Sequence, residues 1–193
     1  MKPPDVTGKA DAPNSKSTIM NEFYDLFEKD NHLKPDFNKT EFESLDSWDF
    51  GWAILEPINL AADKESEIEL SKRFSPGQKA LYFFWYLDGE VTNGGFIQFY
   101  WNENRKYLPA ILKGLKLIGD NEMITLVDNA EKVYLKHIQK FETGNSQEDF
   151  EHLYNELTEF EDLDLKYYEM HDNTMSLIEK YAKQNPNEFL NLI

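Results

Sequence analysis

The chain has 193 residues, no cysteine, and 36 acidic against 20 basic side chains, which gives a net charge of −16. The length indicates one domain, and with 40% apolar residues the chain can form a core, so the acid excess does not indicate disorder. The charge argues against direct binding to nucleic acids or anionic membranes, and the lack of cysteine excludes disulfides and thiol chemistry.

The first 17 residues, MKPPDVTGKADAPNSKS, are polar and rich in proline and glycine. This composition predicts a disordered arm, or an expression remnant, ahead of a single all-α domain over residues 18–193. No apolar run approaches the roughly 18 residues of a membrane helix. No apolar stretch follows the N-terminal lysines, so a secretory signal is not expected, and a cytoplasmic location is the simplest interpretation.

The apolar residues recur at helical spacing along almost the whole chain. The first predicted helix covers residues 19–31 and places on one face Phe23, Leu26 and Phe27. The second covers residues 47–62 and turns inward Trp48, Trp52, Leu55 and Ile58. Pro57 weakens the second prediction, because proline inside a helix removes a hydrogen bond and clashes with the preceding turn.

The segment that begins at Ser75 gives the clearest helix signal. Ser75 is a favourable N-cap, and Pro76 suits the first helical position. Residues 80–91, ALYFFWYLDGEV, are apolar on nearly every side, which predicts a buried central helix over about 75–92. Gly94 and Gly95 are expected to end it, because glycine tolerates positive φ angles, and residues 96–101 to add a further helical turn.

Four more helices are predicted, over residues 107–118, 120–141, 147–160 and 165–183. The first of them turns inward Leu108, Ile111, Leu112 and Leu115. Gly119 is expected to close that helix, and Asp120 to cap the next. About seven helices and no confident strand predict an all-α class, built as one compact bundle around the central helix.

The negative charge is unevenly distributed along the chain. Residues 1–72 carry a net charge of −8, residues 73–141 carry +2, and residues 142–193 carry −10. If residues 147–162 form one helix, five carboxylates lie opposite its apolar face: Glu148, Glu151, Glu156, Glu159 and Asp162. Glu161 would point inward, which indicates a bend near it, and only Lys166 is expected to lie near enough to neutralise the row.

Those five carboxylates would span about 21 Å, or one charge every 5 Å or so, at about 1.5 Å per residue. A DNA strand carries one phosphate per roughly 3.4 Å of its axis, so the spacing is sparser but comparable. Such a row could attract a protein surface built to hold DNA phosphates. The ordinary interpretation of a charge run is a solvated face that keeps the protein soluble.

No catalytic, metal or cofactor motif is present. Asp149 and His152 form one Asp-x-x-His pair, whereas a di-metal helical bundle needs two Glu-x-x-His pairs with further glutamates. Nucleophile elbows, phosphate loops and His-Glu-x-x-His are absent from the sequence, so we predict no enzyme, no metal and no cofactor. Asp88 and Glu90 lie in or beside the apolar helix, where burial would shift the pKa of their carboxyl groups. Their available basic partners are Arg73, Lys79 and Arg105.

A longer motif runs through the near-neutral middle of the chain, as FSPGQKALY at 74–82 and TNGGFIQFYWN at 92–102. These residues resemble the bacterial DNA-mimic protein family of the DMP type, a small all-α domain otherwise of unknown function. The resemblance covers about residues 73–135. It implies a helical, often dimeric, cytoplasmic protein whose surface carboxylates imitate DNA phosphates and occupy the DNA-binding face of a transcription repressor.

The structural interpretation of this motif is a tight corner after a buried helix. Gly94 and Gly95 would reverse the chain. The amides expected to bond exposed backbone groups there are Asn93, Gln98 and Asn102, and the rings expected to fill the core include Phe96 and Phe99. The alternative interpretation is a polar pocket of amides and aromatic rings that holds a small ligand.

The leading hypothesis is an acidic, non-enzymatic interaction protein, a DNA mimic that sequesters a basic DNA-binding protein through the five carboxylates. The second hypothesis is a structural or immunity-type binding module that acts by shape, through an exposed apolar patch. The third is a small-molecule-binding protein that uses the corner at Asn93 and Gln98.

Overall fold

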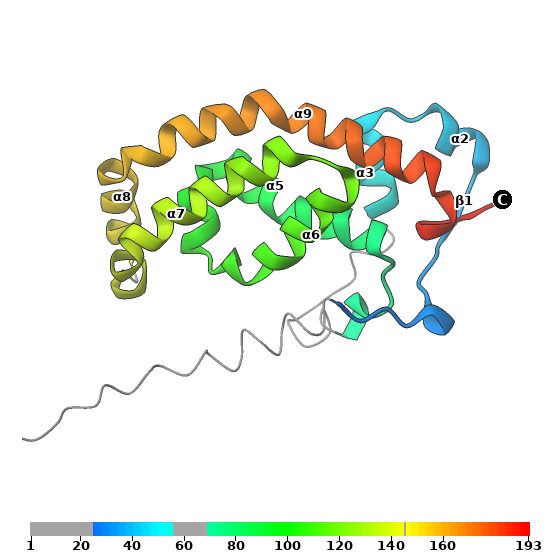
Figure 1. Ribbon diagram of the computed structural model, residues 1–193, viewed down its shortest axis with the longest axis horizontal. Helices are drawn as coiled ribbons and strands as arrows, with labels where there is room; N and C mark the ends of the chain where they lie inside the picture. The colour runs from blue at the N-terminus through cyan, green and yellow to red at the C-terminus, as the bar shows by residue number, and fades with distance from the viewer. Residues whose placement is uncertain (1–24, 56–68, 145) are drawn as a thin grey trace, which may run out of the picture.

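The computed structural model describes residues 25–55, 69–144 and 146–193 (Figure 1). The predicted arm over 1–17, Phe23, Pro57 and Ile58 lie outside the described residues, and so does the side chain of Trp48.

The described chain is almost entirely helical, which confirms the all-α prediction. Its elements are η1 (Lys29–Asn31), β1 (Asp36–Phe37), α2 (Lys39–Ser44), α3 (Ser47–Leu55), α5 (Pro76–Trp101), η3 (Asn104–Tyr107), α6 (Leu108–Ile118), α7 (Asn121–Thr143), α8 (Gln147–Glu156), η4 (Thr158–Phe160), α9 (Glu161–Gln184), η5 (Pro186–Glu188) and β2 (Asn191–Leu192). No helix in these segments is both long and apolar enough to cross a membrane.

Helix α5 is the predicted central helix, and it packs against α3, α6, α7 and α9 (Figure 1). Its start is a capping box, in which the Ser75 hydroxyl accepts from the Gln78 amide at 3.1 Å and the Gln78 side chain accepts from the Ser75 amide at 2.9 Å. The helix does not end at the glycine pair. It kinks there, with non-helical backbone angles at Gly94 and Gly95, and continues to Trp101.

The two predicted apolar faces near the N-terminus are confirmed only at Leu55, which is buried as expected. Among residues 25–31, Asp25 is helical and 29–31 form a 3₁₀ turn, and Leu26 is 49% exposed. Trp52 is 51% exposed and lies against Trp85, with 6.0 Å between ring centroids. Phe50 and Ile54, one turn apart on α3, enter the core together with Leu55, and Trp52 lies on the side opposite Phe50 and Ile54.

Helices α6 and α7 begin and end close to where the sequence predicts. Leu108, Ile111 and Leu115 are buried on α6, and Leu112 is half-buried. Gly119 ends α6 at a φ of 81°, and the Asp120 carboxylate caps α7 by accepting from the Met123 amide at 2.9 Å. The predictions for this hairpin are therefore confirmed.

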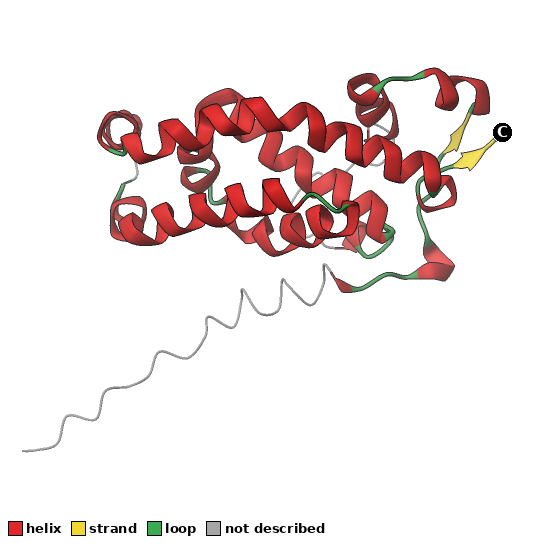
Figure 2. Ribbon diagram, turned by 45° about the horizontal axis from the view of Figure 1, so that its top comes forward, coloured by secondary structure: helices red, strands yellow, loops and turns green. Residues whose placement is uncertain are grey.

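The last two elements of the bundle differ from the prediction. The helix expected over 147–160 ends at Glu156, Leu157 leaves helical geometry, and α9 begins after the short η4 at Glu161. Beyond Pro186, β2 pairs in parallel with β1, with Asp36 facing Asn191 and Phe37 facing Leu192 (Figure 2).

Candidate functional site

The predicted row of carboxylates lies where α8 crosses one end of the molecule, away from the C-terminus (Figure 1). Helix α8 begins with a second capping box, in which the Asp149 carboxylate accepts from the Ser146 amide at 3.1 Å and from its hydroxyl at 2.7 Å. Asp149 of the Asp-x-x-His pair therefore serves as a cap. Within the described residues, no three His, Asp or Glu side chains are grouped as a metal site requires.

All five predicted carboxylates are exposed, but they do not share one helix. Glu148, Glu151 and Glu156 lie on α8, Glu159 lies on η4, and Asp162 lies on the first turn of α9. The assumed straight row is therefore wrong. Leu157 and Phe160 are buried at the bend, so the chain turns to place both in the core.

Two of the five carboxylates are paired with bases of α7. Glu156 accepts a hydrogen bond from Lys140, and Glu159 lies 2.6 Å from both the Lys136 ammonium and the His137 ring nitrogen Nε2. The Lys140 bond lowers the pKa of Glu156, and those from Lys136 and His137 lower the pKa of Glu159. The expectation that only Lys166 lies nearby is wrong, because α7 packs beside η4.

The three other predicted carboxylates and the neighbouring Glu161 form a set that we call the acidic set: Glu148, Glu151, Glu161 and Asp162. All four are exposed, and no basic side chain of the described residues forms an ion pair with them. Glu161 did not fit a straight helix, which predicted a bend near it; the structure has this bend at Leu157, where a new helical phase begins that turns Glu161 to solvent. Glu151 accepts from the Gln147 amide at 3.3 Å.

The motif corner is built around Gly95, which is buried with a φ of 75° and a ψ of 179°. The Asp164 carboxylate of α9 lies against it and accepts from the Phe96 amide at 2.8 Å. Burial, partly offset by this bond, raises the pKa of Asp164 to about 6. Tyr168, also on α9, donates to the Thr92 carbonyl at 3.1 Å, so the corner is held to α9 at two points.

The amides of the motif converge on Glu90 rather than on exposed backbone groups. The half-buried Glu90 carboxylate accepts from the side-chain amides of Gln98, Asn102 and Asn104 at 2.8, 2.8 and 2.7 Å. Asn93 donates to the Gln98 oxygen at 3.0 Å. Phe96 and Phe99 are fully buried, as predicted. This closed network favours the structural interpretation of the motif.

The basic residues expected to pair with Asp88 and Glu90 bond elsewhere. Asp88 accepts from the Tyr167 hydroxyl at 2.9 Å, and burial raises the pKa of its carboxyl group. The three bases are used as follows: Arg73 donates to the Asn31 carbonyl, Lys79 to the Leu26 carbonyl, and Arg105 to Glu131. The sequence pattern did not identify Tyr167 or Asn104 as partners, because both contacts depend on how distant segments pack.

Comparison with known proteins gives one family and one named relative. A family described as DMP19-like protein matches residues 72–185, which include the motif corner and the acidic set. The DNA mimic protein DMP19 of Neisseria meningitidis serogroup B is 26% identical over 121 residues, which cover 61% of this chain and 73% of that protein.

Proposed function

The chain belongs to the DMP19-like protein family, and we propose that it is a non-enzymatic DNA mimic that occupies the DNA-binding face of a basic partner, such as a transcription repressor. The observation that carries the proposal is the acidic set, four exposed carboxylates on α8 and the first turn of α9. The relative's description as a DNA mimic supports this assignment.

The proposal revises which carboxylates stand in for phosphates. Glu156 and Glu159 share their charge with lysines and a histidine of α7, so a partner's basic residues would compete with those bases. Glu148, Glu151 and Asp162 keep their predicted role, and Glu161 joins them. Attraction by exposed charges speeds association and weakens with salt, because ions screen it over about 8–10 Å under ordinary conditions.

The test is affinity capture from the native host with three forms of the full chain. The test variant neutralises the acidic set by Glu148→Gln, Glu151→Gln, Glu161→Gln and Asp162→Asn. The matched control removes the same number of charges from exposed acids outside α8, η4 and α9: Glu41→Gln, Glu43→Gln, Glu122→Gln and Asp128→Asn. Each capture is repeated at low and high salt and with duplex DNA as competitor.

We expect the wild-type chain and the control to retain a DNA-binding protein that high salt and duplex DNA both release, and the test variant to lose it. Retention by the test variant, or equal loss in the control, would show that the acidic set is not the binding face. A partner that resists both salt and duplex DNA would instead support recognition by shape.

A further inference from the structure

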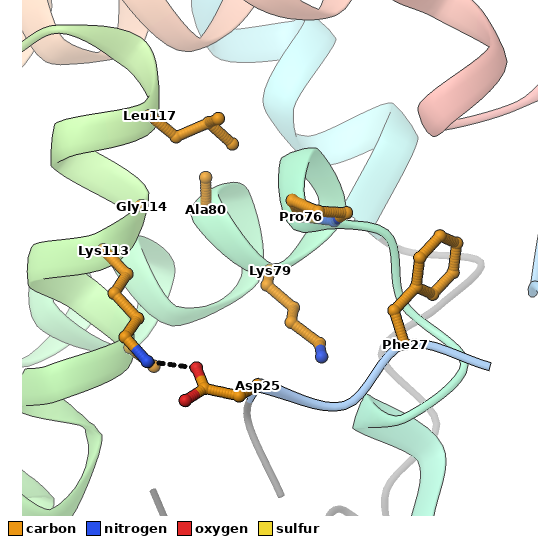
Figure 3. A pocket seen from close by; sticks show the side chains of 9 residues that line it. Asp25, Phe27, Pro76, Lys79, Ala80, Lys113, Gly114 and Leu117 are labelled. Atoms are coloured by element: carbon orange, nitrogen blue, oxygen red, sulfur yellow. Dashed lines mark hydrogen bonds and ion pairs between the residues drawn. The ribbon is translucent and has the colours of Figure 1, made fainter. Parts of the chain in front are cut away.

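A pocket of about 190 Å³ lies at the other end of α5, between the first turns of that helix and α6 (Figure 3). Its walls are mostly apolar and come from Pro76, Ala80, Ala110, Gly114 and Leu117, with Phe27 at the mouth. The two helices touch at its floor, because a Cβ on Gly114 would lie 2.7 Å from the Ala80 Cα. None of the acidic set lines it.

Two lysines bring positive charge into this apolar pocket. Lys79, from α5, is only 8% exposed, and its ammonium donates to the Leu26 carbonyl. Lys113, from α6, pairs with the Asp25 carboxylate at the mouth (Figure 3). The pKa of Lys79 is lowered to about 8, chiefly by burial; the charge of Asp25 opposes this shift, and the charge of Lys113 adds to it. Burying an ammonium is costly, and a nearby anion offsets that cost.

The chain therefore places a carboxylate of its own, that of Asp25, beside Lys113 and near enough to Lys79 to favour its charged form. We propose that the pocket binds a small monocarboxylate with a short hydrocarbon chain, whose carboxylate takes the place of Asp25 beside Lys79 and Lys113. The aliphatic walls suit the hydrocarbon chain, whereas a bare inorganic anion would contact only the two lysines. Pockets for drug-sized ligands measure about 300–1,000 Å³, so this one suits a smaller molecule.

The proposal is tested by calorimetry and by nuclear magnetic resonance titration of the full chain at pH 7, with pentanoate as the probe. Pentan-1-ol supplies the same hydrocarbon chain without charge, and inorganic phosphate supplies charge without the hydrocarbon. We expect saturable binding of pentanoate, with shifts in the amide signals of Ala80 and Gly114, and at least tenfold weaker binding of the other two. Equal binding of the alcohol or of phosphate, or no binding of pentanoate, would overturn the proposal.

Three variants separate the pocket from a general charge effect. Asp25→Asn removes the competing carboxylate and should tighten pentanoate binding by up to about fivefold, the scale of an exposed ion pair. Lys113→Gln should weaken it by a similar factor. Lys116→Gln removes an exposed lysine of α6 that does not line the pocket and should leave binding unchanged. No change with Asp25→Asn, or equal effects of the two lysine variants, would contradict the assignment.

Discussion

Replacing Gly95 with alanine should destabilise the fold by about 3–5 kcal/mol. At a φ of 75° and a ψ of 179°, Gly95 occupies a backbone region essentially restricted to glycine, where another residue costs about 1–3 kcal/mol. A Cβ there would lie 2.4 Å from an Asp164 carboxylate oxygen. The carboxylate must turn away and lose its bond to the Phe96 amide, and a bond to a charged group contributes about 1.5–3 kcal/mol.

The assay is urea unfolding at pH 7, with Gly89→Ala as the control on the same helix. Gly89 is exposed and helical, and nothing lies within 4 Å of an added Cβ, so alanine should stabilise there by about 0.5–1 kcal/mol. In an Asp164→Ala background, Gly95→Ala should lower the free energy of unfolding only by the backbone strain of about 1–3 kcal/mol. The reasoning is refuted if both glycine variants shift stability alike, or if Asp164→Ala leaves the cost of Gly95→Ala unchanged.

Two further predictions concern the same corner. Burial raises the pKa of Asp164 to about 6. Between about pH 4 and about pH 6 the unfolded chain has released the proton of this carboxyl group while the folded protein still holds it, so wild-type stability should fall as pH rises through this range. Asp164→Asn should make this fall smaller and gain about 1 kcal/mol at pH 8, after allowance for solvent screening of the half-buried group; a fall of undiminished size in urea unfolding of the variant contradicts it, whereas a smaller fall is expected to remain because burial also raises the pKa of Asp88. Glu90→Ala should cost about 1–3 kcal/mol, because three side-chain amides lose their acceptor. Exposed Asp128→Ala should change stability by less than about 0.5 kcal/mol, and equal shifts of the melting temperature would exclude a structural role for Glu90.

The features that sequence reasoning predicted well are those settled within one or two helical turns. Ser75 and Asp120 cap helices because a side-chain oxygen reaches an amide three residues later. A break at Gly94 and Gly95 was predicted from the backbone freedom of glycine, although the chain kinks there and does not end the helix. The central helix was recognisable because an all-round apolar surface requires neighbours on every side.

The features that were missed depend on segments brought together by packing. Glu156 and Glu159 meet their bases across 16 to 23 residues of sequence, and the pairs exist only because α7 lies beside the turn after α8. A helical wheel drawn through Leu157 assumes one continuous helix. The helix breaks there because the chain turns to bury Leu157 and Phe160, which the wheel cannot represent. The misfit of Glu161 indicated a bend, but the wheel could not place it and joined acids that belong to different elements.

The bend at Leu157 changes what sets the spacing of the acidic set. On a straight helix, the helical repeat alone would fix the distances between carboxylates, and core substitutions would scarcely alter them. In this fold, Glu148 and Glu151 are carried by α8, whereas Glu161 and Asp162 are carried by α9, and the buried side chains of Leu157 and Phe160 join the two. The pattern of exposed charge is therefore coupled to the packing of the core. Under the proposed function, a core substitution at Phe160 would alter partner affinity without changing any surface charge.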